Sequence, residues 1–198
     1  MATDHPTFDG RGWSNAAADA VALAPPDPSW PAGFAAEARA IRAALGPAGD
    51  ALHVAHVGST AVPGLAAKPV LDLLVVPPDG AWPAALLVDA LAGLGYVHWA
   101  DNPDPAHLFF VKGMPPFGAG RTHHVHVRPW AHACPVLAFR DALRADAALA
   151  REYEALKRRL AALHPTDREA YTRGKDAFVA RVLAAAGAGP TEAGPAPG

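Results

Sequence analysis

The sequence predicts an α/β fold, in which a small mixed sheet of about five strands is flanked by helices. Two apolar runs, Ala51–Val57 and Val70–Val76, enclose a loop of small residues and indicate two strands. Residues Arg121–Arg128 alternate between the two faces of a further strand. From Pro135 to Ala185 apolar residues recur at helical spacing, so the C-terminal part is expected to be a helical segment.

One helix is expected before the sheet. Ser29 is placed to cap this helix, and Pro31 suits its first turn. The helix is expected to end at Gly46-Pro47. The apolar residues of its buried face recur at helical spacing, at Phe34, Ala38, Ile41 and Leu45.

A helix and two strands are expected in the middle of the chain. The helix spans Trp82–Leu94, and Gly95 suits its C-terminal cap. The strands are Tyr96–Trp99 and His107–Lys112, and the second is expected to form an antiparallel hairpin with Arg121–Arg128.

Three helices are expected in the C-terminal part, at Pro135–Arg144, Asp146–Leu163 and Thr166–Ala185. His164-Pro165 separates the last two, and Thr166 with Glu169 forms a predicted capping box. The length of 198 residues favours one domain. We expect this domain to span residues 21–186, between flexible tails at residues 1–20 and 187–198.

Composition excludes several classes of protein. The formal net charge of −2 argues against a general nucleic-acid binder. Cys134 is the single cysteine, so no internal disulfide is expected. The N-terminus lacks a signal-peptide pattern and no apolar run reaches the length of a membrane span. We therefore expect a cytoplasmic protein without a membrane partner.

The loop between the two apolar runs has the composition of a phosphate and metal site. Gly58 lets backbone amides approach an anion, and the hydroxyls of Ser59 and Thr60 add donors. Asp72 is a carboxylate in an otherwise apolar strand, where an unpaired charge is costly. A metal held by this carboxylate would accompany bound phosphates. A tight turn is the alternative interpretation of Gly58-Ser59.

Two histidines form a second candidate site. His124 and His126 point to one face of their strand, whereas His123 shares the opposite face with valines. They could be metal ligands or proton donors beside Asp72, and imidazole suits a transition metal better than magnesium. Imidazoles satisfied within a hairpin are the alternative.

Basic residues supply candidate phosphate ligands, although each is more often a solvated surface charge. Lys68 has the best case because it lies in the loop before Asp72. Tyr171 and Lys175 share a helix face, being four residues apart. The other basic candidates are Arg121, Arg128 and Lys157.

Four stretches together resemble the GrpB family, which is placed in the nucleotidyltransferase superfamily of the DNA polymerase beta type. They are HVGSTAVPGLAAKPVLDLLVV (56–76), THHVHV (122–127), FRDALRADAALAREYEALKRRLAA (139–162) and DREAYTRGKDAFV (167–179). The resemblance covers roughly residues 21–186 and implies a nucleotidyltransferase-like mixed sheet with a C-terminal helical segment.

The resemblance also implies roles for individual residues. Gly58, Ser59 and Thr60 would hold phosphates, together with the basic residues Lys68, Arg121 and Lys175. Asp72 would hold a divalent metal, magnesium or manganese, with zinc as an alternative. The superfamily places a second acid two positions further along this strand, where this chain and commonly the GrpB family have an apolar residue, here Leu74. His124 and His126 would complete the metal site or move protons as catalytic residues.

The function that these features favour is binding of a nucleotide or another phosphorylated small molecule; whether the protein also catalyses metal-dependent nucleotidyl transfer is left open. The alternative is a catalytically degenerate binding or accessory module, linked to coenzyme A metabolism because some GrpB-like domains are joined to dephospho-coenzyme A kinase. A phosphate-binding loop of the Gly-x-x-x-x-Gly-Lys type is absent, so the chain is not that kinase alone. The sequence leaves the acceptor substrate and the oligomeric state open.

Overall fold

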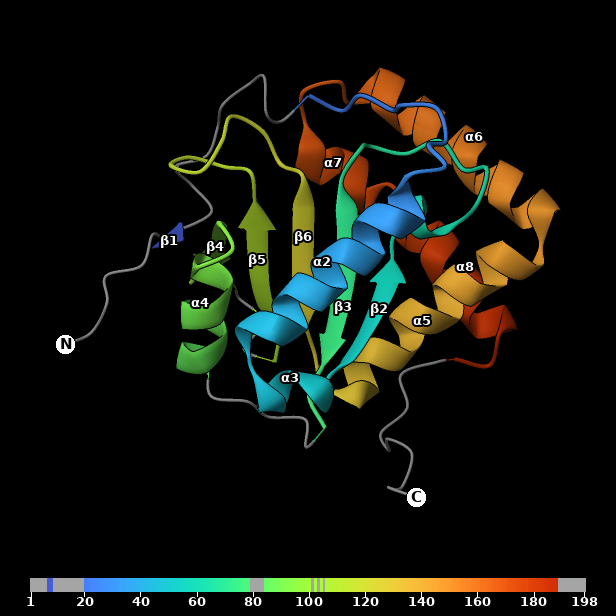
Figure 1. Cartoon of the computed structure of the whole chain (residues 1–198). Helices are drawn as coiled ribbons and strands as arrows, with labels where there is room; N and C mark the ends of the chain where they lie inside the picture. The colour runs from blue at the N-terminus through green and yellow to red at the C-terminus, as the bar shows by residue number, and fades with distance from the viewer. Residues whose placement is uncertain are drawn as a thin grey trace.

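One mixed sheet forms the centre of the fold. The computed structural model describes residues 7–8, 20–78, 84–100, 102, 104 and 106–188. Five strands were expected and are present as β2 (His53–Val57), β3 (Leu71–Val76), β4 (Tyr96–Trp99), β5 (Leu108–Lys112) and β6 (His123–Val127). They lie side by side in the order β4-β5-β6-β3-β2 (Figure 1).

The pairing of the strands is mixed, as predicted. Strand β3 pairs antiparallel with β2 and parallel with β6, and β6 pairs antiparallel with β5, which confirms the expected hairpin. The register of the central pair places Asp72 beside His124 and Leu74 beside His126. Because residues at aligned positions point to the same face, the carboxylate and both imidazoles project from one side of the sheet.

The sheet extends beyond the five expected strands. Thr7–Phe8 forms a short strand, β1, that pairs in parallel with β4 at the edge of the sheet. These two residues belong to the segment 1–20 that we expected to be a flexible tail, and their pairing with β4 was not predicted from the apolar pattern. Residues 1–6 and 9–19 lie outside the described part of the chain, as do residues 189–198 of the second tail.

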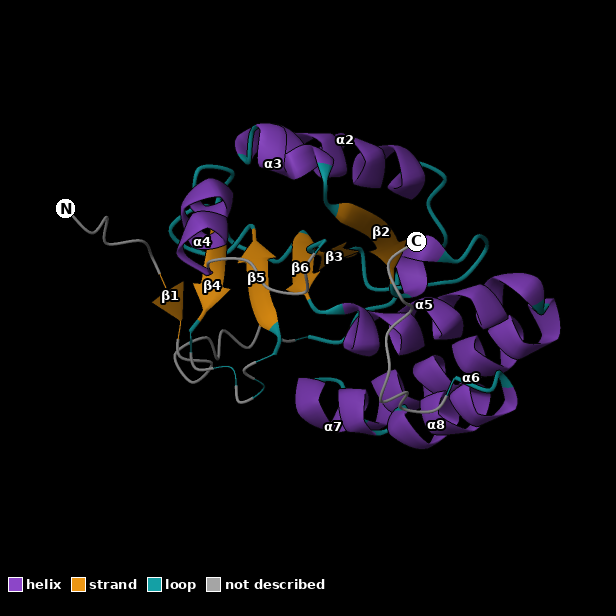
Figure 2. Cartoon of the chain, turned by 90° about the horizontal axis from the view of Figure 1, so that it is seen from below, coloured by secondary structure: helices purple, strands orange, loops and turns teal. Residues whose placement is uncertain are grey.

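Helices α2 (Trp30–Ala44), α3 (Pro47–Asp50) and α4 (Ala84–Ala92) cover one face of the sheet (Figure 2). The apolar face of α2 packs on this side of β3 and β6, where Ile41, Leu73 and Val125 are almost fully buried. Ser29 precedes α2 but makes no side-chain cap; instead its backbone N–H donates to Asp27 Oδ1 at 2.8 Å. The start of the predicted helix at Trp82 falls outside the described residues.

The C-terminal helices cover the opposite face (Figure 2). They are α5 (Trp130–Ala145), α6 (Ala147–Leu163), α7 (Arg168–Arg173) and α8 (Asp176–Ala185). Helix α5 starts at Trp130 and contains Pro135, so this proline does not mark the first turn as we expected. None of the described helices is long and apolar enough to cross a bilayer.

The last predicted helix, Thr166–Ala185, is divided in two. It breaks at Gly174, where a side chain would overlap Leu160 of α6, so α7 approaches α6 more closely than other residues permit. The predicted capping box is also wrong, because Asp167 rather than Thr166 caps α7 by accepting a hydrogen bond from the N–H of Ala170 at 2.9 Å.

The loop after β2 is anchored by the C-terminal helices. Val62 and Leu65 of this loop are buried in one cluster with residues of α5, α6 and α8, which are Leu143, Tyr153, Phe178 and Val182. The helices therefore fix the position of the loop that begins with Gly58-Ser59.

Candidate functional site

A cavity of about 860 Å³ opens between the sheet and the C-terminal helices. Its walls are the loop 58–60, the helix-facing side chains of β3 and β6, and residues 166–175 around α7. The predicted site residues that line it are Gly58, Ser59, Thr60, Lys68, Asp72, Arg121, His124, His126 and Lys175. A volume of this size is typical of small-molecule sites.

The loop after β2 is held by specific contacts. Gly58 has a φ of +71°, and Ser59–Ala61 forms a short 3₁₀ turn, η1. Ser59 and Tyr153 both line the cavity beside this turn. Thr60 Oγ1 donates to the carbonyl of Val70 at 3.4 Å and lies 3.0 Å from Nε2 of His56. The Thr60 hydroxyl therefore joins β2 to β3, whereas Gly58 and Ser59 form the edge of the cavity.

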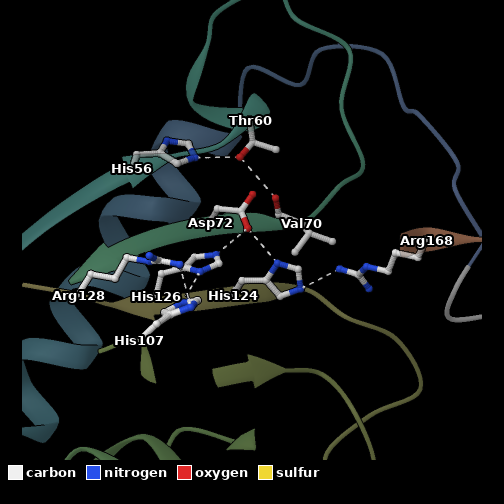
Figure 3. A network of polar contacts seen from close by, with 9 residues as sticks. All are labelled: His56, Thr60, Val70, Asp72, His107, His124, His126, Arg128 and Arg168. Atoms are coloured by element: carbon white, nitrogen blue, oxygen red, sulfur yellow. Dashed lines mark hydrogen bonds and ion pairs between the residues drawn. The ribbon is translucent and has the colours of Figure 1, made fainter. Parts of the chain in front are cut away.

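Asp72, His124 and His126 meet on the cavity wall (Figure 3). The Oδ1 atom of Asp72 lies 2.9 Å from Nδ1 of His124 and 3.6 Å from Nε2 of His126. One ligand atom from each residue falls within 4.8 Å of the other two. Leu74, at the position of the missing second acid, points to the same face and is fully buried among apolar residues.

Further polar contacts extend from this cluster on both sides (Figure 3). Nε2 of His107 lies 3.0 Å from Nδ1 of His126, and Nη2 of Arg128 lies 2.9 Å from Nδ1 of His107. At the other end, Nη2 of Arg168 lies 3.5 Å from Nε2 of His124. Arginine can only donate, so both terminal imidazole nitrogens act as acceptors.

This network controls the charge of its members. Burial alone would raise the pKa of Asp72, but hydrogen bonds from His124 and His126 hold that pKa well below its ordinary value. Burial lowers the pKa of His124 to about 4 and that of His107 to about 3. At neutral pH Asp72 is therefore a carboxylate and His124 a neutral imidazole, which are the charge states that metal ligands require.

Cationic side chains gather on the opposite wall. The ammonium groups of Lys68 and Lys175 lie 5.1 and 4.7 Å from the centre of the Tyr171 ring. Burial, followed by repulsion from Arg168 and Lys175, lowers the pKa of Lys68 to about 7. Arg121 adds a further positive charge to the same cavity. The arrangement concentrates positive charge where an anion would meet the Gly58-Ser59 loop.

The other two basic candidates have different roles. Lys157 also lines this cavity, but its side chain is buried and donates to the carbonyl of Ala66 in the loop before β3. Arg128 belongs to the histidine network and also pairs with Asp104 at 3.6 Å.

Sequence reasoning missed two residues of the site, Arg168 and His107. Arg168 belongs to the DREAYTRGK stretch, which signals a site without identifying the residue. His107 lies opposite Arg128 when the β5–β6 register is continued by one residue, so an exact hairpin register would have revealed it.

A second cavity, of about 650 Å³, lies behind the Gly58-Ser59 loop. It shares Gly58, Ser59 and Tyr153 with the first cavity and has a mostly apolar lining from α5 and α8. The loop therefore separates the first cavity from a second one, whose lining also includes Asp104, Arg128, His132 and Arg140.

The donor set of the cluster fits a single metal ion. With metal–ligand bonds of about 2.1 Å and tetrahedral angles, two ligand atoms lie roughly 3.4 Å apart. The separations of 2.9 and 3.6 Å at Asp72 Oδ1 bracket this value. Two imidazoles and one carboxylate favour manganese, zinc or iron over magnesium.

The chain matches a protein-family model, related sequences and a related crystal structure. A family model described as GrpB protein matches residues 20–185. A UPF0157 protein of Pseudomonas aeruginosa is 58% identical over 178 residues, which cover 90% of this chain and 72% of the relative. The crystal structure of the conserved protein GrpB from Enterococcus faecalis has a TM-score of 0.71 at 33% identity, over 83% of this chain and 96% of that one.

Two further matches cover part of longer proteins. A dephospho-CoA kinase of Mycolicibacterium paratuberculosis is 32% identical over 179 residues, covering 79% of this chain but 43% of the kinase. Cid1, a poly(U) polymerase of the nucleotidyltransferase superfamily solved with its short product ApU, has a TM-score of 0.50 at 14% identity over 70% of this chain and 42% of Cid1. This second likeness is one of fold alone, and it confirms the nucleotidyltransferase-like sheet that we expected.

Proposed function

The chain belongs to the GrpB family, and from this premise we propose that its charged cavity binds a nucleotide or another phosphorylated small molecule together with a divalent metal ion. The observation that carries the proposal is that a carboxylate–imidazole cluster and a group of cations face each other across one cavity. A ligand that bridges these walls needs an anionic part for the cations and a metal to join it to Asp72.

The phosphate end of the ligand is assigned to the loop and the basic wall. Gly58 and Ser59 would offer backbone N–H groups, as in other anion-binding concavities. Lys68, Arg121 and Lys175 would neutralise phosphate charge, and Arg168 joins them from α7. Because Lys68 is buried beside other cations, an anion would relieve repulsion that already exists in the free protein.

The metal is assigned to Asp72, His124 and His126. When bound, it would act as a Lewis acid on the phosphates and offset their negative charge. With Leu74 instead of a second acid, the site carries one carboxylate, so magnesium should bind weakly in the absence of phosphates. Manganese or zinc suits the imidazoles better.

Nucleotidyl transfer is the reaction we propose for this cavity. An acceptor hydroxyl would form a new bond to the α-phosphorus while pyrophosphate leaves, and the hydroxyl proton would pass to a base. The cations at Lys68, Lys175 and Arg168 would stabilise the charge on the leaving pyrophosphate. The fold that the chain shares with Cid1 supports this reaction class.

A specific observation favours a second candidate, a binding or accessory module without turnover. Leu74 is fully buried in an apolar cluster, so no carboxylate takes the usual second position on β3. The chain also matches less than half of a dephospho-CoA kinase, which is consistent with a module that accompanies another enzyme.

Calorimetric and thermal titrations would test the proposal. The full chain is titrated with ATP, UTP and inorganic pyrophosphate, with and without manganese, and pyrophosphate release is measured in parallel. We expect nucleotide and manganese to raise the melting temperature together, and Asp72→Asn to remove the manganese-dependent part. Asp50→Asn, a surface change of the same charge on α3, is the matched control.

Absence of stabilisation by any phosphorylated compound would contradict the binding function. Stabilisation without pyrophosphate release would favour the module over the transferase.

A further inference from the structure

The contacts of His107 with Arg128 and His126 define where the imidazole protons lie. A guanidinium carries only donors, so Nδ1 of His107, 2.9 Å from Arg128 Nη2, must accept. The proton of a neutral His107 is then on Nε2, which lies 3.0 Å from Nδ1 of His126. Nδ1 of His126 accepts this proton's hydrogen bond, so His126 carries its own proton on Nε2.

The proton on His126 points at the carboxylate. Nε2 of His126 lies 3.6 Å from Oδ1 of Asp72, on the side where the metal would bind. A metal ligand must offer a lone pair, so Nε2 has to give up this proton before it can coordinate an ion. In this arrangement (Figure 3), Nε2 of His126 faces Asp72, and with its proton in place it offers no lone pair to a metal.

Moving that proton disturbs the whole chain of contacts. If His126 binds a metal through Nε2, its proton lies on Nδ1 and faces Nε2 of His107. His107 must then accept there and carry its proton on Nδ1, which faces the guanidinium of Arg128. Two donors would meet at a distance of 2.9 Å, so metal binding breaks the hydrogen bond between Arg128 and His107.

We propose that Arg128 is a positioning residue that, through His107, holds His126 as its Nε2–H tautomer and thereby weakens metal binding at Asp72. When the contact between Arg128 and His107 opens, His126 becomes free to offer Nε2 to the metal. The consequence for metal affinity rests on the function proposed above, whereas the tautomer of His126 in the metal-free protein does not.

Arg128 is itself held in place, which allows it to act in this way. Its Nη1 lies 3.6 Å from Oδ2 of Asp104, and the guanidinium is half-buried. The planes of the His107 and His126 rings lie at 16° to each other with their centroids 5.1 Å apart, which suits a hydrogen bond in the plane of both rings. Arg128 therefore lies as a fixed donor at one end of a row of contacts through His107 and His126, and the carboxylate of Asp72 lies at the other end.

The tautomers can be measured directly by long-range ¹H–¹⁵N correlation spectra of the metal-free full chain, with His107→Gln and His126→Gln spectra for assignment. We expect both imidazoles to carry their proton on Nε2 in the wild-type protein. Arg128→Lys keeps a donor and should preserve this pattern. Arg128→Gln, which can also accept, should let His126 populate the Nδ1–H form.

Manganese titration of the same variants tests the consequence. We expect the affinity for manganese to rise about tenfold in Arg128→Gln, because metal binding then no longer brings two hydrogen-bond donors together. The affinity should stay unchanged in Arg128→Lys. Because Arg128→Gln also removes a positive charge, His107→Phe is the charge-neutral control. This change keeps a ring at position 107 but removes the hydrogen bonds to Arg128 and His126. It should raise the affinity for manganese by a similar factor.

Two results would overturn the proposal. One is a metal-free wild-type protein in which His126 carries its proton on Nδ1, a measurement that needs no variant to fold. The other is an Arg128→Gln protein with an unchanged tautomer and unchanged manganese affinity. If no variant binds manganese, the proposed metal site fails, and the spectra alone then decide whether Arg128 sets the tautomer.

Discussion

Gly58 lies directly against the side chain of Asp72. A Cβ atom added at Gly58 would come within 3.0 Å of Asp72 Cγ and 3.1 Å of its Cβ, and would overlap the carboxylate oxygen. Gly58 also has a positive φ of +71°, a conformation that other residues rarely adopt. The glycine to which we assign a place beside the phosphate is therefore also the residue that leaves room for the candidate metal ligand.

The first prediction separates these two roles of Gly58. Gly58→Ala should lower the free energy of unfolding by about 3 kcal/mol, because a backbone with φ +71° and ψ −173° and the overlap with Asp72 both cost energy. Gly64→Ala is the matched control, since Gly64 has a φ of +78° but no atom within 4 Å of an added Cβ. It should cost only about 1–2 kcal/mol. Urea unfolding measures both, and equal losses would show that contact with Asp72 is unimportant.

The second prediction concerns the charge of Lys68. The pKa of Lys68 is lowered to about 7 by burial and by neighbouring cations, so a large fraction is neutral near pH 7.5. A bound phosphate favours the charged ammonium and raises that pKa, so binding should take up protons. Calorimetry with inorganic pyrophosphate, in buffers of different ionisation enthalpy, measures this uptake.

Lys68→Met should reduce the proton uptake, whereas Lys112→Met should not, because Lys112 pairs with Glu37 on the other face of the sheet. The same buffer dependence in both variants would place the phosphate away from Lys68.

The third prediction follows from the buried histidines. Burial lowers the pKa of His56 to about 4, as it does for His124, and that of His107 to about 3. Between pH 6.5 and 4 the unfolded chain binds protons at these positions while the folded protein does not. The stability that they contribute is thus complete above pH 6.5 and falls as the pH is lowered. Asp72 acts in a different range, because a carboxyl with a depressed pKa loses its contribution only below about pH 3.9.

Urea midpoints at pH 7.5 and pH 4.5 would measure this dependence. His56→Gln should reduce the difference between the two midpoints by the equivalent of about one proton. His132→Gln, at an exposed position, is the control and should leave the difference unchanged. A His56→Gln protein with the full wild-type pH dependence would show that His56 is protonated normally in the folded state.

The central part of the site could be predicted from the sequence because it depends on local patterns. Alternation along β6 places His124 and His126 on one face, and the apolar run of β3 requires that strand to lie inside the sheet. A carboxylate in a buried strand needs polar neighbours, so the contact between Asp72 and these imidazoles could be predicted from the sequence.

The rest of the site depends on distances that the sequence does not record. The loop between β5 and β6 is too long to fix their register by turn chemistry, so the position of His107 opposite Arg128 could not be derived. Arg168 reaches His124 from α7, 44 residues away in the chain, and a contact of this kind depends on how the C-terminal helices pack on the sheet. Asp167 and Thr166 are adjacent residues that can both cap a helix, and local pattern does not distinguish them.

The last prediction concerns the relation between the sheet and the C-terminal helices. Phe178 of α8 is 8% exposed and packs in one cluster with Val62 and Leu65 of the loop that follows Gly58. We expect the helices and the sheet to unfold together as one domain, so loss of this side chain should destabilise both. Phe178→Ala should cost about 3–5 kcal/mol, whereas the same change at Phe117, which is 48% exposed, should cost far less.

Urea unfolding is followed by tryptophan fluorescence and by far-ultraviolet circular dichroism. Coincident transitions, shifted equally by Phe178→Ala, are expected because the loop joins both layers. A helical transition that moves alone would show that the C-terminal helices form a separate unit, and the Gly58-Ser59 loop would then lose its support without loss of the sheet.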